Sequence, residues 1–266
     1  MAGNGWKVVM NQDGVTISSD LFQLTTNSSE STQLGSVVTE LQGVTRDAYG
    51  QYCGLARAAE MIGERWGLLI LRDLLVSPKS VTELRMGLPR ISADLLAMRL
   101  REMEFSGVVR RQDPTRDLDQ AVYELTEYGR SVEDVLLALS RWGAMTLATP
   151  RPEDIVTEDS LVVALRSTFR PEAARELTVG FELRVDGNVV HAVVDHGNLT
   201  VNAGPLPGAD VIVELGTVLK GMLSGAVDIA DAIATGQVTV TGDAALLDTF
   251  VELFQLPSAP APVIPS

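Results

Sequence analysis

The sequence contains one cysteine, two histidines and no long apolar run in its 266 residues. A single cysteine excludes an internal disulfide framework and is typical of a protein in a reducing compartment. No stretch approaches the ~20 consecutive apolar residues that a membrane helix needs. The N-terminus also lacks the basic-then-apolar layout of a secretory signal. We therefore expect a cytoplasmic protein that does not bind or cross a membrane.

The residue patterns of common catalytic and metal sites are missing as well. His191 and His196 have no paired cysteines at a zinc-binding spacing, so we expect ordinary surface or packing residues. The chain has no nucleophile elbow and no phosphate-cradling glycine loop. We predict that the protein is not an enzyme and that it uses neither a metal ion nor a cofactor.

The net charge is strongly negative, −14 at pH 7, but it is unevenly distributed. Residues 1–45 carry −3, residues 46–149 carry −1 and residues 150–266 carry −10. Phosphate binding depends on local clusters of basic residues and not on the total charge. The nearly neutral middle region is therefore compatible with nucleic-acid binding. Six of its arginines lie in one stretch: Arg90, Arg99, Arg101, Arg110, Arg111 and Arg116.

A length of 266 residues favours two domains or one large one, and a hydrophobic content of 45% is ample for real cores. The helix and strand patterns described below predict the α+β class. Pro150 and Pro152 interrupt a helical pattern and indicate a linker. The predicted organisation is an N-terminal extension (1–45), a first domain (46–149), a second domain (150–256) and a proline-rich tail (257–266).

The N-terminal extension has little pattern. Trp6–Met10 and Val15–Ser18 are predicted to pair as a hairpin across Asn11–Gly14. Thr25–Gly35 is rich in Ser, Thr and Asn and is predicted to be a loop. A wrongly assigned start codon and a genuine extra segment both remain open, and we favour a mostly flexible tail.

Residues 91–111 carry the strongest local signal. Ser92 is a helix N-cap candidate, because its hydroxyl can accept a bond from a free amide of the first turn. Leu96, Leu100 and Met103 recur at helical spacing as a buried stripe. Gly107 can end the helix in the left-handed conformation. A strand with two arginines follows, which is the order of a recognition helix and wing in winged helix-turn-helix proteins.

The neighbouring segments support this interpretation. Helical patterns cover 53–61, 65–76 and 80–86, and Pro78 and Pro89 fall in the turns between them. A polar turn at 113–120 separates the first wing strand from a return strand at 121–125. Thr126 is predicted to cap one long helix that runs to about Leu147.

Residues 52–145 resemble the HxlR family of bacterial transcription regulators. The resemblance rests on Cys53, Gly63-Glu-Arg-Trp66, Ile70-Leu-Arg-Asp-Leu74, Glu83-Leu84, Ile91-Ser92, Leu96, Arg99-Leu100, Gly107-Val-Val109, Arg111, Tyr123-Glu-Leu-Thr126, Gly129, Leu139 and Trp142-Gly143. It implies a homodimer that binds double-stranded operator DNA.

The candidate DNA-binding residues lie off the buried stripe or in the wing. They are Ser92, Asp94, Leu95, Met98, Arg99, Arg101, Arg110, Arg111 and Arg116. An arginine that reads guanine is the commonest specific contact. Asp94 either accepts from a cytosine amine or favours the helix N-terminus electrostatically, and we prefer the second. Arg99 contacts DNA or forms an internal ion pair, and the sequence does not decide between them.

Cys53 is a redox candidate. It precedes a predicted helix, where a thiol pKa is lowered, and Arg57 is one turn away. The alternative is a purely structural role.

The second domain is predicted to be a four- or five-stranded antiparallel sheet covered by helices. An opening helix contains Leu161–Leu165, and strands are expected at 177–185, 189–194, 198–203, 209–215 and 236–242. This part resembles the sterol-carrier-protein-type lipid-binding fold through Ala209-Asp-Val-Ile-Val213, Thr217–Gly225, Gly236, Val238–Val240, Gly242-Asp243 and Leu253-Phe254. The resemblance implies an apolar tunnel for a fatty acyl or similar ligand. A filled core that only supports dimerisation is the alternative.

The sequence therefore predicts a DNA-binding transcriptional regulator, a repressor in our preferred interpretation, with a possible apolar small-molecule or lipid effector. One alternative is a thiol-sensing regulator that uses Cys53. Another is a lipid carrier whose winged helix contacts protein.

Overall fold

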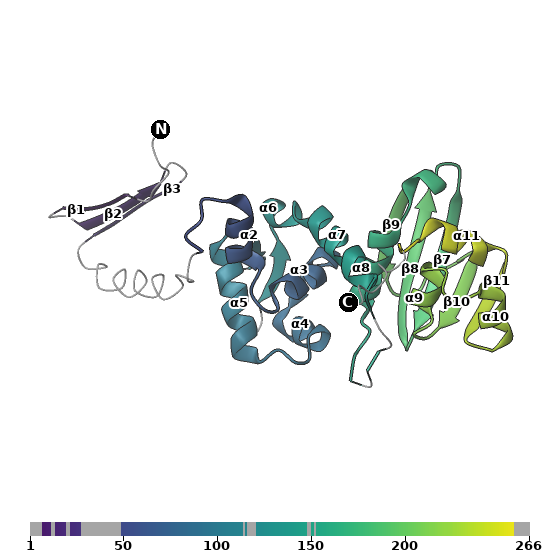
Figure 1. The fold of residues 1–266 in the computed structure, drawn as a ribbon. Coiled ribbons are helices and arrows are strands. Elements are labelled where there is room, and N and C mark those ends of the chain that lie inside the picture. The colour runs from purple at the N-terminus through teal and green to yellow at the C-terminus, as the bar shows by residue number, and fades with distance from the viewer. Residues whose placement is uncertain are drawn as a thin grey trace, which may run out of the picture. The chain divides into compact units, whose positions relative to one another are not determined.

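The computed structural model describes residues 7–11, 14–19, 22–27, 49–113, 115, 121–147, 150–151 and 153–257. The chain forms two compact units, Met1–Glu60 and Met61–Ser266. In the first unit, β1 (Lys7–Asn11), β2 (Gly14–Ser19) and β3 (Phe22–Asn27) form an antiparallel sheet in the order β1-β2-β3 (Figure 1). The predicted pairing across Asn11–Gly14 is confirmed. Thr25–Asn27 belong to β3 and not to a loop, and residues 28–35 lie outside the described part.

A winged helix-turn-helix follows. Its elements are α2 (Gly54–Ile62), α3 (Gly67–Val76), β4 (Lys79–Ser80), α4 (Val81–Gly87), α5 (Ala93–Phe105), β5 (Val109–Arg111) and β6 (Val122–Leu125). The three strands form an antiparallel sheet in the order β4-β6-β5. The helices and wing strands confirm the predicted order. The two-residue strand β4 was too short to leave a pattern in the sequence.

The prediction of one continuous helix from Thr126 is wrong, because the structure has two helices there. They are α6 (Glu127–Arg130) and α7 (Glu133–Ala144), separated by a turn at Ser131. The Ser131 hydroxyl donates to the Tyr128 carbonyl at 2.7 Å, a local bond that competes with helical pairing. Thr126 does cap the first piece, since its hydroxyl oxygen accepts from the Gly129 amide.

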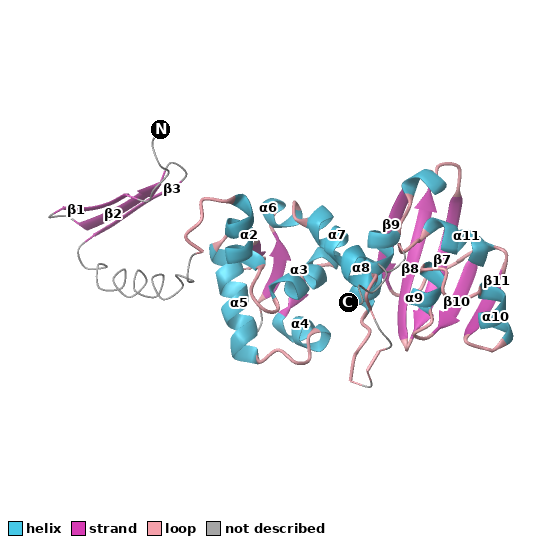
Figure 2. Ribbon diagram, in the orientation of Figure 1, coloured by secondary structure: helices cyan, strands magenta, loops and turns pink. Residues whose placement is uncertain are grey.

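The C-terminal part begins with α8 (Glu158–Thr168) and places helices against a five-stranded sheet (Figure 2). The strands run in the order β11-β10-β7-β8-β9. Their bounds are β7 (Thr178–Val185), β8 (Asn188–Asp195), β9 (Asn198–Ala203), β10 (Val211–Leu215) and β11 (Val238–Gly242). The remaining helices are α9 (Leu219–Leu223), α10 (Ile229–Ala234) and α11 (Leu246–Leu253).

The sheet is mixed, which corrects the prediction of an antiparallel sheet. β10 pairs with β7 in parallel, with Val211 opposite Phe181. The segment between β9 and β10 passes over β7, where the Leu206 amide donates to Glu182 and the Gly180 amide donates to Asp210. A Cβ on Gly180 would lie 2.7 Å from Leu206 Cδ2, so a larger residue in β7 would displace the Leu206 side chain of the crossing segment.

Aromatic rings fill the space between this sheet and α11. The rings of Phe181 and Phe250 are 5.3 Å apart between centroids, and those of Phe250 and Phe254 are 4.7 Å apart. All three side chains are buried. Such ring pairs stabilise a core beyond the area they bury.

The C-terminal core also includes residues of the winged helix. Val76 at the end of α3 and Ala144 at the end of α7 pack against it. Lys79 Nζ of β4 forms an ion pair of 3.0 Å with Asp159 of α8. The DNA-binding elements and the C-terminal part of the second unit therefore share both apolar and charged contacts.

Among the residues that the structure describes, none of the helices combines the length and apolarity needed to cross a membrane.

Candidate nucleic-acid interface

The helix-turn-helix is held by local caps at both of its helices. At α4, the Ser80 amide donates to Glu83 Oε2 at 2.7 Å and the Glu83 amide donates back to Ser80 Oγ at 3.2 Å. This capping box satisfies free amides of the first turn, and the hydrogen bonds from Ser80 lower the pKa of Glu83. At α5, Ser92 Oγ accepts from the Leu95 amide at 3.3 Å. The predicted N-cap role of Ser92 is confirmed.

The recognition helix α5 divides into a buried and an open face. Leu96, Leu100 and Met103 are fully buried, as predicted. On the other side Ser92, Asp94, Met98 and Arg101 are exposed, and Leu95 is half-buried. Met98 is 42% exposed, so its apolar side chain is available for contact on this face.

Arg99 has an internal partner on each side. Its Nη1 donates to Glu102 at 2.7 Å and its Nη2 donates to Glu64 at 3.0 Å. The side chain is only 10% exposed. Of the two roles that the sequence left open, the geometry favours the internal ion pair, which ties α5 to the segment before α3.

The wing arginines are paired with carboxylates. Arg110 forms an ion pair of 2.7 Å with Glu124 on the neighbouring strand, and hydrogen bonds from Gln112 and Arg110 lower the pKa of Glu124. Arg111 Nε donates to Glu104 of α5 at 2.9 Å, and that hydrogen bond raises the pKa of Arg111. Arg110 remains 66% exposed and open to phosphate. Arg116 lies outside the described residues.

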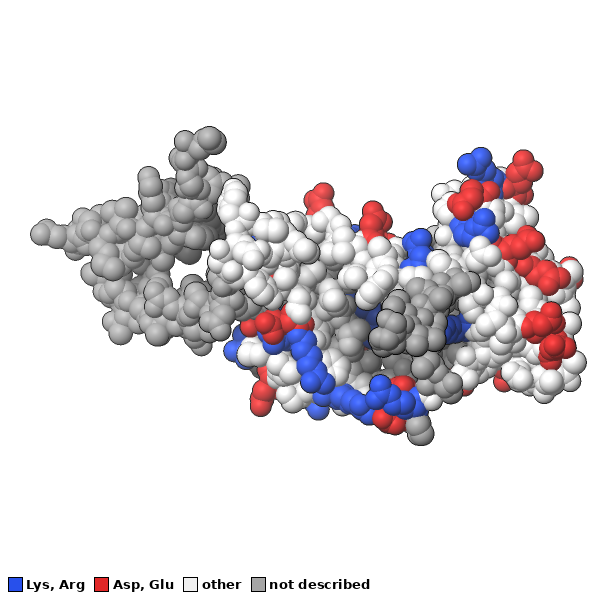
Figure 3. Space-filling model, in the orientation of Figure 1, with Lys and Arg blue, Asp and Glu red and all other residues white. Residues whose placement is uncertain are grey.

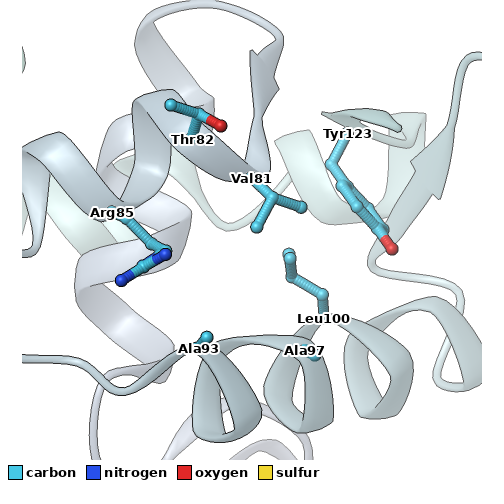
Figure 4. Close-up of a pocket in the computed structure, with 7 residues that line it drawn as sticks. All are labelled: Val81, Thr82, Arg85, Ala93, Ala97, Leu100 and Tyr123. Carbon is cyan, nitrogen blue, oxygen red and sulfur yellow. The ribbon is translucent and has the colours of Figure 1, made fainter. Parts of the chain in front are cut away.

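A small pocket lies between the two helices of the motif (Figure 4). Its volume is about 260 Å³, and α4 and α5 contribute most of its lining. Arg85 of α4 extends toward the first turn of α5 near Ala93, while Tyr123 closes the opposite end (Figure 4). Arg85 is exposed and has no ion-pair partner within the described part of the chain. Sequence reasoning missed it, although a basic residue in the last turn of the helix before a recognition helix was the available signal.

Charge separates along the second unit. Figure 3 shows lysine and arginine side chains along one edge of the winged helix and mainly aspartate and glutamate on the visible C-terminal surface. Arg85, Arg90 and Arg101 are all exposed. Clustered arginines beside an open helix face are the electrostatic arrangement that phosphate binding requires.

Cys53 precedes α2 in the first unit and is exposed. Hydrogen bonds from the backbone amides of Ala56 and Leu55 lower its pKa. Arg57, expected to assist, instead donates to Glu60 at 3.2 Å. The lowering of the Cys53 pKa therefore comes from amides at the helix start and not from a neighbouring cation.

Metal-binding geometry is not found in the described ranges, where no group of three or more His, Cys, Asp or Glu side chains gathers. His191 Nδ1 contacts the Gly204 carbonyl at 2.9 Å, and His196 Nδ1 lies 2.7 Å from Asp195.

A family model described as HxlR-like helix-turn-helix matches residues 61–150. The HTH-type transcriptional regulator YtcD of Bacillus subtilis is 40% identical over 85 residues, which cover 32% of this chain and 68% of that protein. The chain belongs to the HxlR-like helix-turn-helix family. The HTH-type regulator YkvN of the same organism is 36% identical over 91 residues and is covered to 77%. An HxlR-type protein is a transcriptional regulator, and its helix-turn-helix implies DNA binding.

Solved structures of similar proteins cover about a third of the HxlR-type chain. The crystal structure of a ytcD regulator is 37% identical and covers 35% of this chain and 94% of that one, with a TM-score of 0.33. The oxidized form of the redox regulator HypR is 28% identical and covers 36% of this chain and all of that one, with a TM-score of 0.34.

Proposed function

We propose that the protein is a homodimeric repressor that binds an inverted-repeat operator and responds to a small molecule through its C-terminal part. The observation that carries the DNA-binding role is the open face of α5, where Met98 and Arg101 are exposed beside the exposed Arg85 of α4. A guanidinium on this face reads a base or clamps phosphate, and an apolar side chain contacts a thymine methyl. Repression follows if the bound dimer occludes a promoter.

An apolar row on α7 supports the homodimer. Val135 is 54% exposed, Leu139 42% and Trp142 69%. Their spacing of four and three residues places them on one helix face. Exposed aromatic and aliphatic groups in a continuous row are typical of protein interfaces. Trp142→Ser should shift the protein from dimer to monomer in light scattering.

Footprinting on DNA flanking the gene tests the operator proposal. We expect protection of two half-sites about one helical turn apart. Arg101→Ala and Met98→Ala should weaken protection, whereas Arg175→Ala, an exposed arginine of the C-terminal part, should not. Equal protection of unrelated DNA by all variants would contradict specific recognition. A promoter fused to a reporter gives the sign of regulation.

A second candidate function is thiol sensing through Cys53. Its exposure and lowered pKa favour reaction with an oxidant or electrophile. Oxidant-induced release of operator DNA should then disappear in Cys53→Ser and persist in wild type. Release that survives the substitution would eliminate this mechanism.

A third candidate is a lipid-binding role for the sterol-carrier-like part. The helix-covered five-stranded sheet and its large apolar core support it. The Phe181, Phe250 and Phe254 rings occupy the layer where the expected tunnel would run, so a ligand there has to displace them. Mass spectrometry of organic extracts from purified protein tests for a bound lipid. A purely structural C-terminal part would give an empty extract.

A further inference from the structure

A large open cleft lies within the second unit, between the winged helix and the C-terminal part. Its volume is about 1140 Å³, which is ample for a small-molecule ligand. One wall is α3 and the turn Gly87–Arg90 that leads into the recognition helix. The other wall is the segment that precedes α8 together with α9. A molecule in this cleft would touch both the DNA-reading elements and the acidic C-terminal part.

Apolar side chains line the cleft, and some of them are partly exposed to solvent. Trp66, Leu69 and Leu88 line it from the winged helix, and Ile155 and Val156 line it from the other wall. Leu69 is 41% exposed and Ile155 is 54% exposed. An apolar tail laid between them would remove both side chains from water, which is favourable in proportion to the area covered.

Cations outnumber carboxylates around these side chains, in a chain whose net charge is −14. Arg72, Arg90, Arg151 and Lys220 line the cleft, together with Glu153 and Asp154. The Arg151 backbone amide donates to Asp154, and within the described residues the Arg151 guanidinium forms no ion pair. In the part of the chain that the structure describes, the hydrogen bond of Lys220 Nζ goes to the Leu147 carbonyl, a neutral group. Arg72 is held against the wall by Asp73, 2.6 Å from its Nη2. These cations suit one anionic head group, because charge-assisted hydrogen bonds are the strong ones.

We propose that this cleft binds an amphipathic anion, a carboxylate with an apolar tail, and that Arg151 and Lys220 hold the carboxylate. The inference deepens the proposed regulation, on which its effector role rests, and it places the effector outside the aromatic core. Because Gly87–Arg90 runs directly into α5, an occupied cleft changes the position of the recognition helix relative to the rest of the dimer. A ligand acts in this way only through a difference in affinity between two arrangements.

Isothermal titration of the full-length protein with dodecanoate, below its micelle concentration, tests the site. Dodecyltrimethylammonium is the matched ligand, because it has the same tail and the opposite head charge. We expect one dodecanoate per chain and at least tenfold weaker binding of the ammonium compound. Each of Arg151→Gln and Lys220→Gln should weaken dodecanoate roughly tenfold, the usual effect of losing a bond to a charged group. Arg175→Gln removes a charge elsewhere and should leave the affinity unchanged.

Thermal melts establish that each variant is folded, and Leu69→Trp provides an independent probe. It fills the cleft from the α3 side without changing charge and should weaken dodecanoate. Absent binding, equal binding of both head groups, or affinities unchanged in these variants would overturn the inference. DNA footprinting with and without dodecanoate separates the two proposals. If the protein protects a specific DNA site but does not bind dodecanoate, only the cleft proposal is contradicted. If it binds dodecanoate but protects no specific site, the operator proposal is contradicted.

Discussion

Arg111 Nε of the wing donates to Glu104 Oε1 of the recognition helix at 2.9 Å. This ion pair joins the two elements expected to touch DNA. In the protein without DNA, the Glu104 carboxylate therefore partly neutralises the positive charge of Arg111.

Glu104→Gln should therefore strengthen non-specific DNA binding. The substitution removes a carboxylate near the phosphates and leaves Arg111 free to contact one. The logarithmic dependence of affinity on salt should steepen by about 0.9, the effect of one additional phosphate contact. Fluorescence anisotropy with random-sequence duplex over a salt series measures this slope. Glu127→Gln changes the net charge equally at another exposed site and should leave the slope unaltered. An identical slope in both variants would show that Arg111 never reaches the backbone.

Arg99 and Arg101 are neighbours on α5 with opposite expected roles. Arg99→Met removes the partner of Glu64 and Glu102 and should lower the free energy of unfolding by about 2 kcal/mol, less than a fully buried pair because Glu64 is half exposed. Arg101→Met should change stability by less than about 0.5 kcal/mol and should weaken DNA binding. Urea unfolding measures the stability of the two variants, and fluorescence anisotropy measures their DNA binding. A larger stability loss in Arg101→Met than in Arg99→Met would contradict the roles given to the two arginines.

Gly129 meets the backbone of the wing. A Cβ at this position would lie 1.9 Å from the Val108 carbonyl oxygen, a contact that no side-chain rotation relieves. Gly129→Ala should cost about 3 kcal/mol or more of stability because the wing and α6 must separate. Gly143→Ala in α7 is the control, since nothing lies within 4 Å of its Cβ position and alanine favours helix by about 1 kcal/mol. Denaturant midpoints of the two variants should move in opposite directions.

Asp73 makes stability depend on pH. Burial raises the pKa of this carboxyl to about 6 from 3.8, against the attraction of Arg72 and Lys79, and nearby Asp159 adds to the rise. The folded protein therefore holds a proton that the unfolded chain has lost, and its contribution to stability declines as pH rises through 6. Between pH 4.5 and 7.5 the loss should be about 2 kcal/mol.

Asp73→Asn removes this titration. Relative to wild type, the variant should gain about 2 kcal/mol in unfolding free energy between pH 4.5 and pH 7.5. Urea unfolding at the two pH values gives the difference directly. A constant difference would mean that Asp73 titrates near its ordinary pKa.

Local signals in the sequence predicted α4, α5 and the wing well. The Ser92 cap, the Leu96 stripe and Gly107 act within a few residues of one another, so the sequence displays them together. The parallel pairing of β10 with β7 could not be read in this way, because it depends on a loop that crosses β7 at Gly180. Strand patterns identify which face is buried but not which strand is the neighbour.

The sequence predicted which face of α5 is exposed, but it did not predict the ion pairs that the arginines form. Exposed Met98 and Arg101 are where the helical pattern put them. The Arg99–Glu64 and Arg110–Glu124 pairs were not predictable, because their partners are distant in sequence and nothing local marks the pairing. Arg85 was not predicted, because it lies on α4, outside the stretch from Arg90 to Arg116 in which the arginines cluster.

Val76 and Ala144 belong to the winged helix yet pack against the core of the C-terminal part. Residues 61–257 should consequently melt in one cooperative transition instead of two. A fragment cut at the Pro150 linker would start with uncovered apolar surface at the ends of α3 and α7. Grafting the extension onto a winged helix that lacks it would therefore require these two contact positions to be transferred as well.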